Sequence, residues 1–306
     1  MEREPAIKHF IAIDGVPTSF LLGCIERAQD FIEPHNASKY SERLRGKTLI
    51  SCFYEPSTRT RASFDVAATR LGCALVHING ANSSSQKGES LQDTARTLEA
   101  MRPNAVVLRH PASGACHCIA PLLKCALINA GDGMHAHPTQ ALLDCATILR
   151  HKGSIQGLEV CILGDVLHSR VARSGIAALL RLGAKVRVCG PPTLMPPASS
   201  LPDVPYVADL KQAVQGCDVI MVLRLQRERQ LRGLIPSVQD YHRCFGLQSH
   251  HLRHAKPNVI VMHPGPVNRA VEIDPALVEG EHSVILDQVA MGVALRMAVL
   301  EMLMHP

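Results

Sequence analysis

Hydroxyl and guanidinium side chains crowd into five residues, "STRTR", at positions 57–61. The apolar piece "ISCFY" before them is typical of a strand. An apolar stripe with helical spacing follows them, at Phe64, Ala67, Ala68 and Leu71. Ser57 therefore stands where a helix N-cap belongs, and the helix begins near Thr58. Because the first N–H groups of a helix lack intrahelical acceptors and carry the positive end of its dipole, we interpret the segment as a phosphate cradle.

The two arginines of this segment cannot serve one ligand together. Residues two apart lie about 200° apart around a helix. We assign Arg59 to the phosphate and Arg61 to an internal ion pair. The alternative interpretation is an ordinary capped helix with solvated arginines.

Two further strand ends carry basic and amide groups. Arg109 and His110 close the run "AVVLRH", and "INAGDGMHAHPTQ" delivers His137 and Gln140 to a helix that Pro138 opens. Ligands of open α/β sheets bind outside the carboxyl ends of the strands. We therefore expect these groups to converge with the phosphate cradle.

A second set of basic residues follows strands in the later half. Arg170 lies in "GDVLHSRVARS", and Arg224 and Gln226 share a face because they lie two residues apart past a strand. Guanidinium groups match carboxylates bidentately, so this set suits a dicarboxylate. We expect Arg232 to be solvated. We also expect Glu228 or Glu55 to pair with one of three arginines: Arg224, Arg227 or Arg229.

Short β-branched runs alternate with helical patterns and must position these groups. The expected strands are 48–53, 73–78, 105–110 and 125–129, then 158–165, 184–190, 217–224 and 258–264, with a helix at 168–182. Strands separated by helices predict crossover connections and a parallel sheet. The sequence thus predicts an α/β protein of two domains, each a parallel sheet flanked by helices, with the active site in the cleft between them.

The domain boundaries follow from one helix that joins the two series. We expect a first domain over 1–137, a connecting helix over 138–150 and a second domain over 151–287. The connecting helix shows a single apolar face, made by Ala141, Leu142, Cys145 and Leu149. The last helix, within 288–306, is apolar, and we expect it to pack back on the first domain.

Composition narrows the class of function. The chain has 306 residues and a net charge of +5, from 32 Lys+Arg against 27 Asp+Glu spread along its length. That pattern favours small anionic ligands over nucleic acid. The sequence has no run of 18 apolar residues and does not begin with a signal-peptide pattern, so we expect a soluble, cytoplasmic protein without a membrane partner.

The 11 cysteines lie mostly in apolar runs, and no CxxC pair occurs. We interpret them as reduced core residues rather than disulfides or zinc ligands. A zinc site at Cys116, His117 and Cys118, with Cys125 nearby, is the alternative. Its spacing differs from the usual zinc pattern, so buried helix cysteines are preferred, and we expect no metal and no cofactor. A dinucleotide site is also disfavoured, because the residues after Gly164 do not complete a GxGxxG pattern.

Six segments together closely resemble the aspartate branch of the aspartate/ornithine carbamoyltransferase family. They are "FYEPSTRTRASF", "VLRHPASGA", "INAGDGMHAHPTQALLD", "GDVLHSRVARS", "VLRLQRER" and "MHPGPVNRAVEI". The resemblance extends from about residue 45 to the C-terminus. The "RxQ" and "HPGP" segments are characteristic of the aspartate branch, whereas the ornithine branch has "HCLP" in place of "HPGP".

The resemblance implies transfer of the carbamoyl group of carbamoyl phosphate to the amine of L-aspartate in pyrimidine biosynthesis. It assigns seven residues to carbamoyl phosphate: Ser57, Thr58, Arg59, Thr60, Arg109, His137 and Gln140. The phosphate would be held by Ser57, Thr58, Arg59 and Thr60. The carbonyl oxygen would be polarised by Thr60, Arg109 and His137, and Gln140 would fix the carbamoyl NH₂. It assigns six residues to aspartate: Lys87, Arg170, Arg224, Gln226, Gly265 and Pro266.

The resemblance also implies a homotrimer with shared active sites. "SSSQKGES" is similar to the mobile loop of the family, which reaches into the neighbouring subunit's site and places Ser83 and Lys87 there. A larger assembly with regulatory chains or a dihydroorotase-like protein stays open. A non-catalytic subunit with the same fold is the rival interpretation. It is disfavoured because every matched catalytic position carries the expected residue type.

Overall fold

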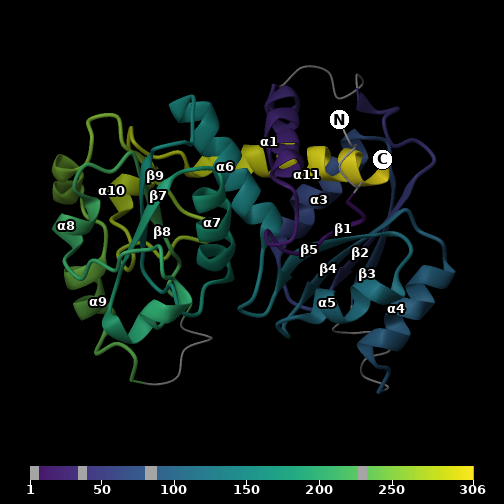
Figure 1. Cartoon of the computed structure of the whole chain (residues 1–306), viewed down its shortest axis with the longest axis horizontal. Coiled ribbons are helices and arrows are strands. Elements are labelled where there is room, and N and C mark those ends of the chain that lie inside the picture. The colour runs from purple at the N-terminus through teal and green to yellow at the C-terminus, as the bar shows by residue number, and fades with distance from the viewer. Residues whose placement is uncertain (1–6, 34–39, 80–87, 227–232, 306) are drawn as a thin grey trace. The chain divides into compact units, whose positions relative to one another are not determined.

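The computed structural model describes residues 7–33, 40–79, 88–226 and 233–305. The chain divides into unit 1, Met1–Ala146 with Val289–Pro306, and unit 2, Thr147–Gln288. Each unit contains one parallel sheet flanked by helices (Figure 1), which confirms the predicted fold class. Within the described residues, no helix is both long and apolar enough to cross a membrane.

Unit 1 is built on a parallel sheet with the strand order β1-β5-β4-β2-β3. The strands are β1 (His9–Phe10), β2 (Thr48–Phe53), β3 (Ala74–Asn79), β4 (Ala105–His110) and β5 (Ala126–Asp132). Its helices include α1 (Thr18–Ile32), α3 (Thr58–Arg70), α4 (Leu91–Ala100) and α5 (Ala115–Ile119). The strands β2 to β5 lie where the apolar runs predicted them. The two-residue β1 is too short to show a pattern, and the sequence did not predict it.

The register of this sheet brings the predicted strand ends to one edge. Phe53 of β2 pairs with Arg109 of β4, and His110 of β4 pairs with Asp132 of β5. Because neighbouring parallel strands point the same way, their carboxyl ends leave the sheet side by side. The segments that follow β2, β4 and β5 are therefore neighbours within unit 1.

Unit 2 has a parallel sheet with the strand order β7-β6-β8-β9. The strands are β6 (Glu159–Leu163), β7 (Lys185–Cys189), β8 (Val219–Val222) and β9 (Ile260–Met262), and all four were predicted. The helices are α7 (Arg170–Arg181), α8 (Leu210–Val214), α9 (Val238–Phe245) and α10 (Pro275–Val278). Valine, isoleucine and leucine side chains of this sheet form the core of the unit with residues of α8 and α10.

Two long helices contribute residues to both units, α6 (Pro138–Lys152) and α11 (Ile285–Met304). The prediction of a single apolar face on α6 is wrong, because residues 141–148 are all buried. Neighbours within unit 1 explain this burial. The Gln29 side chain of α1 donates to Ala146 O at 3.0 Å. A Cβ atom added at Gly292 of α11 would lie 3.4 Å from the Leu143 side chain.

Nine of the 11 cysteines are buried and all are reduced. Cys118 and Cys244 are exposed, so the interpretation of the cysteines as core residues is wrong for these two. Cys118 lies on the one-and-a-half-turn helix α5, which buries only one side against the sheet. Cys116 on that side is fully buried, as expected.

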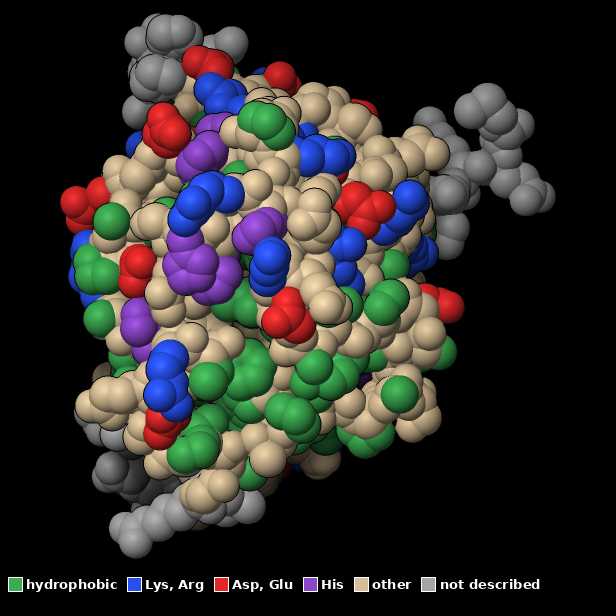
Figure 2. Space-filling model, turned by 90° about the vertical axis from the view of Figure 1, so that its left-hand side faces the viewer, with side chains coloured by type: hydrophobic (Ala, Val, Ile, Leu, Met, Phe, Trp, Pro, Cys, Tyr) green, Lys and Arg blue, Asp and Glu red, His purple; other side chains and the backbone are tan. Residues whose placement is uncertain are grey.

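Histidine side chains gather on the face of the molecule that Figure 2 shows. In unit 2, the rings of His250 and His251 lie 3.9 Å apart in a short 3₁₀ helix, Ser249–His254. Burial and the neighbouring charges of His250 and His254 lower the pKa of His251.

Candidate active site

The start of α3 offers an accessible anion site. Ser57 is its N-cap, as predicted, with an extended backbone (φ −159°, ψ 100°), and its hydroxyl makes no capping hydrogen bond within the described residues. Thr58 and Arg59 are exposed, whereas Thr60 is buried. The hydroxyl of Ser57 is therefore not used by the helix itself, and the first turn of α3 presents N–H groups, hydroxyls and a guanidinium together.

Arg61 takes a different direction from Arg59. Its guanidinium lies 4.9 Å over the ring of Phe53. Burial raises the pKa of Asp65, and the charges of His77 and Arg61 partly oppose that rise. Arg61 thus packs on β2 and acts on the charge of Asp65 of its own helix. The internal ion pair assigned to it from the sequence stays a prediction.

Arg109 is fixed from two sides at the end of β4. Its Nε lies 3.4 Å from Glu55 Oε2, and its Nη1 donates to Ala130 O at 3.1 Å. Its side chain is only 12% exposed. The sequence made Glu55 a candidate partner for an arginine that follows β8. In the structure Glu55 pairs instead with Arg109 of its own unit. The pair holds the Arg109 guanidinium in place at the sheet edge.

His110 is turned toward the loop that follows it. Its Nδ1 accepts a hydrogen bond from Ala112 N at 3.0 Å, and its ring packs 4.9 Å from that of Tyr54. Burial lowers the pKa of His110, so the imidazole stays neutral near pH 7. It supports the loop rather than adding a second charge beside Arg109.

His137 and Gln140 are buried at the start of α6. The carbonyl of His137 accepts from Gln140 N at 3.0 Å and from Ala141 N at 3.2 Å, so the helix begins there. Gln140 Nε2 donates to Asp144 Oδ1 at 3.0 Å. Because its NH₂ group is engaged by Asp144, the amide of Gln140 presents its oxygen as the remaining acceptor. That oxygen suits a ligand NH₂ group.

Asp144 in turn faces a second buried charge. Burial lowers the pKa of Arg296 to about 10, and the charge of Asp144 opposes that shift. Arg296 of α11 also stacks 5.1 Å over the ring of Phe64. Neither Asp144 nor Arg296 was identified from the sequence. The position of Asp144, four residues after Gln140 on a helix, was the available signal.

The loop between β5 and α6 is held by one carboxylate. Asp132, which is fully buried, accepts from Gly114 N at 2.7 Å, Ala136 N at 3.0 Å and Asn129 Nδ2 at 2.8 Å. Gly133 has φ +47°, and a Cβ there would lie 2.3 Å from Ser113 Oγ. Only glycine fits this turn, and the turn leads directly to His137.

The predicted carboxylate receptors of unit 2 lie at a helix start and after a strand. Arg170 is the first residue of α7 and is buried, and the Ser169 hydroxyl caps that helix by accepting from Ala172 N at 3.1 Å. Arg224 and Gln226 follow β8 and are half-buried. Leu225 between them is 1% exposed. This alternation puts Arg224 and Gln226 on one side of the segment, as predicted.

A buried imidazole and carboxylate hold the "HPGP" segment. His263 Nε2 lies 3.1 Å from Glu272 Oε1, and both side chains are 0% exposed. His263 Nδ1 accepts from Gly265 N at 2.8 Å, so Nε2 carries the proton that is donated to Glu272. The same oxygen of Glu272 accepts from Asn268 N at 2.6 Å. The pair thus fixes both ends of the segment that carries the cis peptide bond between Gly265 and Pro266.

Six residues named from the sequence lie outside the described residues. They are Ser83, Lys87, Arg227, Glu228, Arg229 and Arg232. The roles suggested for them stay predictions.

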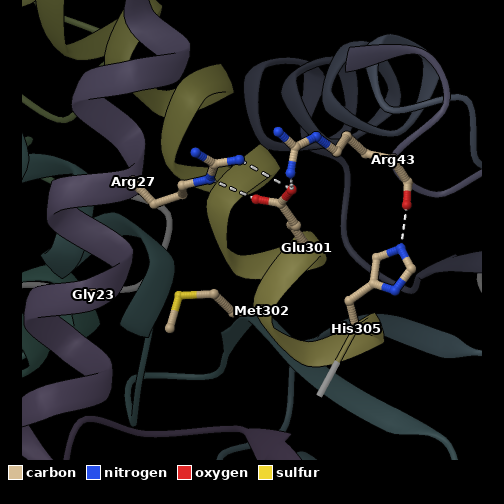
Figure 3. A pocket seen from close by; sticks show the side chains of 6 residues that line it. All are labelled: Gly23, Arg27, Arg43, Glu301, Met302 and His305. Carbon is tan, nitrogen blue, oxygen red and sulfur yellow. Dashed lines mark hydrogen bonds and ion pairs between the residues drawn. The ribbon is translucent and has the colours of Figure 1, made fainter.

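A separate hollow of about 540 Å³ lies in unit 1 (Figure 3). It is lined by Gly23, Arg27, Arg43, Glu301, Met302 and His305. Glu301 accepts from Arg27 Nε at 2.6 Å and from Arg43 Nη1 at 2.9 Å. Both arginines already pair with one carboxylate of α11, and the hollow includes none of the predicted site residues. These ion pairs hold α11 against the rest of unit 1.

Comparison with known proteins matches nearly the whole chain to one family. Residues 8–150 match the carbamoyl-P binding domain of aspartate/ornithine carbamoyltransferase, and residues 156–303 match its Asp/Orn binding domain. The chain is 50% identical over 297 residues to the aspartate carbamoyltransferase catalytic subunit of Methylorubrum extorquens strain PA1, covering 97% of this chain and 94% of that protein. It is 48% identical over 297 residues to the subunit of the same name from Bradyrhizobium diazoefficiens, with the same coverage.

Solved structures of both branches share the fold. Aspartate transcarbamoylase from Trypanosoma cruzi, in complex with carbamoyl phosphate and aspartate, is similar with a TM-score of 0.86 and 29% identity over 96% of each chain. Ornithine carbamoyltransferase from Pyrococcus furiosus is similar with a TM-score of 0.88 and 27% identity over 99% of each chain. The fold alone therefore does not distinguish the two acceptors.

Proposed function

The chain belongs to the aspartate/ornithine carbamoyltransferase family, and we propose that it transfers the carbamoyl group of carbamoyl phosphate to the amine of L-aspartate. The products are N-carbamoyl-L-aspartate and phosphate, a step of pyrimidine biosynthesis. The observation that carries this proposal is 50% identity, over 97% of the chain, to a protein named aspartate carbamoyltransferase catalytic subunit. A cytoplasmic location agrees with the reduced cysteines.

Carbamoyl phosphate binds to residues of unit 1. The phosphate takes the first turn of α3, where the N–H groups, the hydroxyls of Ser57, Thr58 and Thr60, and the Arg59 guanidinium offer donors. The accessible Ser57 hydroxyl and the exposed Arg59 support this role. The carbamoyl NH₂ donates to Gln140, whose own NH₂ is engaged by Asp144.

The reaction is promoted by stabilisation of an oxyanion. When the aspartate amine attacks the carbamoyl carbon, the carbonyl oxygen gains negative charge, and the C–O bond to the phosphate then breaks. Thr60, Arg109 and His137 donate to that oxygen. Preset donors act where charge develops, and the fixed position of Arg109 between Glu55 and Ala130 supports this role. The departing phosphate accepts the proton of the amine, so no side chain is needed as a general base.

Aspartate binds to residues of unit 2 and to Lys87. Arg170 and Arg224 pair with its carboxylates, Gln226 donates beside them, and the backbone of Gly265 and Pro266 lies against the acceptor. A receptor of this charge repels the ammonium end of ornithine. The acceptor choice thus depends on charge rather than on the fold.

A direct assay tests the proposal. The purified chain is supplied with carbamoyl phosphate labelled in its carbonyl carbon, and with either aspartate or ornithine as acceptor. We expect turnover with aspartate and essentially none with ornithine. Comparable rates with both acceptors, or turnover with ornithine alone, would contradict the aspartate assignment.

The assembly is proposed to be a homotrimer in which Ser83 and Lys87 of one subunit complete the site of the next. Mixing of inactive variants tests this sharing. If Lys87→Ala and Arg59→Ala proteins are each inactive, hybrids that share sites across the interface contain some sites free of both defects, and activity returns. If Lys87 serves its own subunit, every site keeps one defect and activity stays absent. Native mass measurement then shows whether regulatory or dihydroorotase-like chains join the trimer.

A further inference from the structure

Two histidines and a buried aspartate of unit 1 come together beside the end of β5. His117 belongs to α5, which packs against β5 (Figure 1), Asp132 ends β5, and His135 follows in the next turn. One ligand atom of each lies within 4.8 Å of the others. We infer that His117, Asp132 and His135 bind one divalent transition-metal ion of the zinc type.

The geometry of the two rings fits a shared ion. The ring centroids of His117 and His135 lie 5.2 Å apart, with an interplanar angle of 76°. Two imidazoles on one tetrahedral zinc ion, with Zn–N bonds of about 2.1 Å, have centroids about 5 Å apart. His135 Nδ1 lies 3.0 Å from Asp132 Oδ2. Two ligand atoms of a tetrahedral zinc ion lie about 3.4 Å apart, so a small movement opens this edge for an ion.

The charge of the cluster also suits a cation. Asp132 accepts from three N–H groups in addition to His135, and these bonds fix the orientation of its carboxylate. Two imidazoles and one carboxylate form a known zinc donor set and leave one position for water. On binding, the coordinating nitrogen of His135 presents its lone pair to the ion, and the imidazole proton lies on the other ring nitrogen.

The adjacent cysteine does not contribute a ligand. Cys116 is fully buried among the apolar side chains of the unit 1 core. His117 lies instead beside His135, 18 residues later in the sequence and just after β5. Among the described residues, the cluster that could hold a metal ion includes no cysteine. His117 is exposed and His135 half-buried, so an ion reaches them from solvent.

A bound ion would stabilise the turn that precedes His137. Asp132 and Ala136 form an antiparallel bridge, in which Asp132 N donates to Ala136 O at 3.1 Å. An ion joining His117 to Asp132 and His135 ties α5 to this turn. None of these three residues contacts the substrates in the proposed reaction, so the ion supports the loop and takes no part in the carbamoyl transfer.

Metal titration of the full chain tests the site. Protein treated with EDTA is titrated with Zn²⁺ by calorimetry at pH 7.5, and with Co²⁺ by visible absorption, which reports tetrahedral coordination. Wild type is compared with His117→Gln, His135→Gln and the control His250→Gln, which changes an exposed histidine of unit 2. Circular dichroism verifies that each variant is folded.

We expect one ion per chain in wild type and in His250→Gln, and binding at least about tenfold weaker in both His117→Gln and His135→Gln. The tetrahedral cobalt spectrum should disappear in the same two variants. The inference is overturned if wild type binds no ion at one per chain, if His117→Gln binds like wild type, or if His250→Gln loses the ion. Because no substrate is present, these outcomes are independent of the carbamoyl-transfer assay.

Discussion

The two units hold their candidate residues in different ways. In unit 1, Arg109, His137 and Gln140 are buried or nearly so. Glu55 and Asp144 hold two of these side chains in place. Arg109, expected to donate to the carbonyl oxygen, and Gln140, expected to accept from the carbamoyl NH₂, are therefore fixed before any ligand arrives.

In unit 2 the expected aspartate receptors depend more on connecting segments. Arg224 and Gln226 are half-buried on the segment after β8, and Pro266 is exposed. Arg170 differs from them, because it is buried at the start of α7. The fixed element nearby is the His263–Glu272 pair, which holds the "HPGP" segment through its backbone.

This difference predicts that substitutions in the two units change different kinetic parameters. Donors that are fixed in advance stabilise charge that develops in the transition state, so their loss lowers kcat. Groups on less constrained segments supply binding energy to the ground state and the transition state alike, so their loss mainly raises KM. The predictions below test whether rate and acceptor binding divide between the units in this way.

The largest expected effect is on Arg109. Arg109→Ala removes a preset donor to the carbonyl oxygen and should lower kcat about 100- to 1000-fold, with little change in the KM for aspartate. Steady-state kinetics with both substrates measure this. Arg43→Ala is the matched control, since it removes a half-exposed arginine of the same unit that pairs with Glu301. A folded Arg109→Ala enzyme with normal kcat would remove Arg109 from the mechanism.

Arg224→Ala should act on the acceptor. Loss of a charged hydrogen bond worth about 1.5–3 kcal/mol should raise the KM for aspartate about 10- to 100-fold, while the KM for carbamoyl phosphate stays near its original value. Arg243→Ala, at an exposed arginine of unit 2, is the control. If Arg224→Ala leaves aspartate saturation unchanged in a folded protein, the acceptor site has been assigned wrongly.

Glu272 should act indirectly, as a positioning residue. Glu272→Ala leaves the buried His263 and the Asn268 N–H without their acceptor. It should cost about 1–3 kcal/mol of unfolding free energy and raise the KM for aspartate more than it lowers kcat. Glu272→Gln keeps an oxygen for both donors and should restore most of both. Lowered stability with an unchanged KM in Glu272→Ala would leave Glu272 a purely structural role.

The smallest effect concerns acid stability in unit 2. The folded state lowers the pKa of His251, so the unfolded state binds more protons once the pH falls below the ordinary value of about 6.5. The stability of unit 2 should therefore be full above that pH and decline below it. His251→Gln should flatten this decline in thermal melts between pH 7.5 and 5. An unchanged slope would show that other groups cause it.

Local patterns were enough to predict the strand ends and the cap of α3. "AVVLRH" gives β4 with Arg109 near its end, and Ser57 before an apolar stripe gives the start of α3. These features depend on neighbours within a few residues, and the parallel order then follows from the helices between strands. The residues that must converge could thus be named from the sequence.

Long-range contacts could not be predicted in the same way. Arg296 faces Asp144 from a helix more than 150 residues later, so no local pattern links them. The complete burial of residues 141–148 likewise depends on α1 and α11, which come from opposite ends of the chain. His117 and His135 meet only because α5 packs against β5.

The central claim is that unit 1 alone supplies the site for the phosphate-bearing substrate. Calorimetric binding of phosphonoacetamide, a stable analogue of carbamoyl phosphate, tests it without aspartate and without turnover. The account predicts that Arg59→Ala weakens this binding about tenfold or more, through loss of a charged hydrogen bond, while Arg224→Ala binds it as tightly as wild type. Wild-type affinity in Arg59→Ala, or a comparable loss in Arg224→Ala, would contradict it.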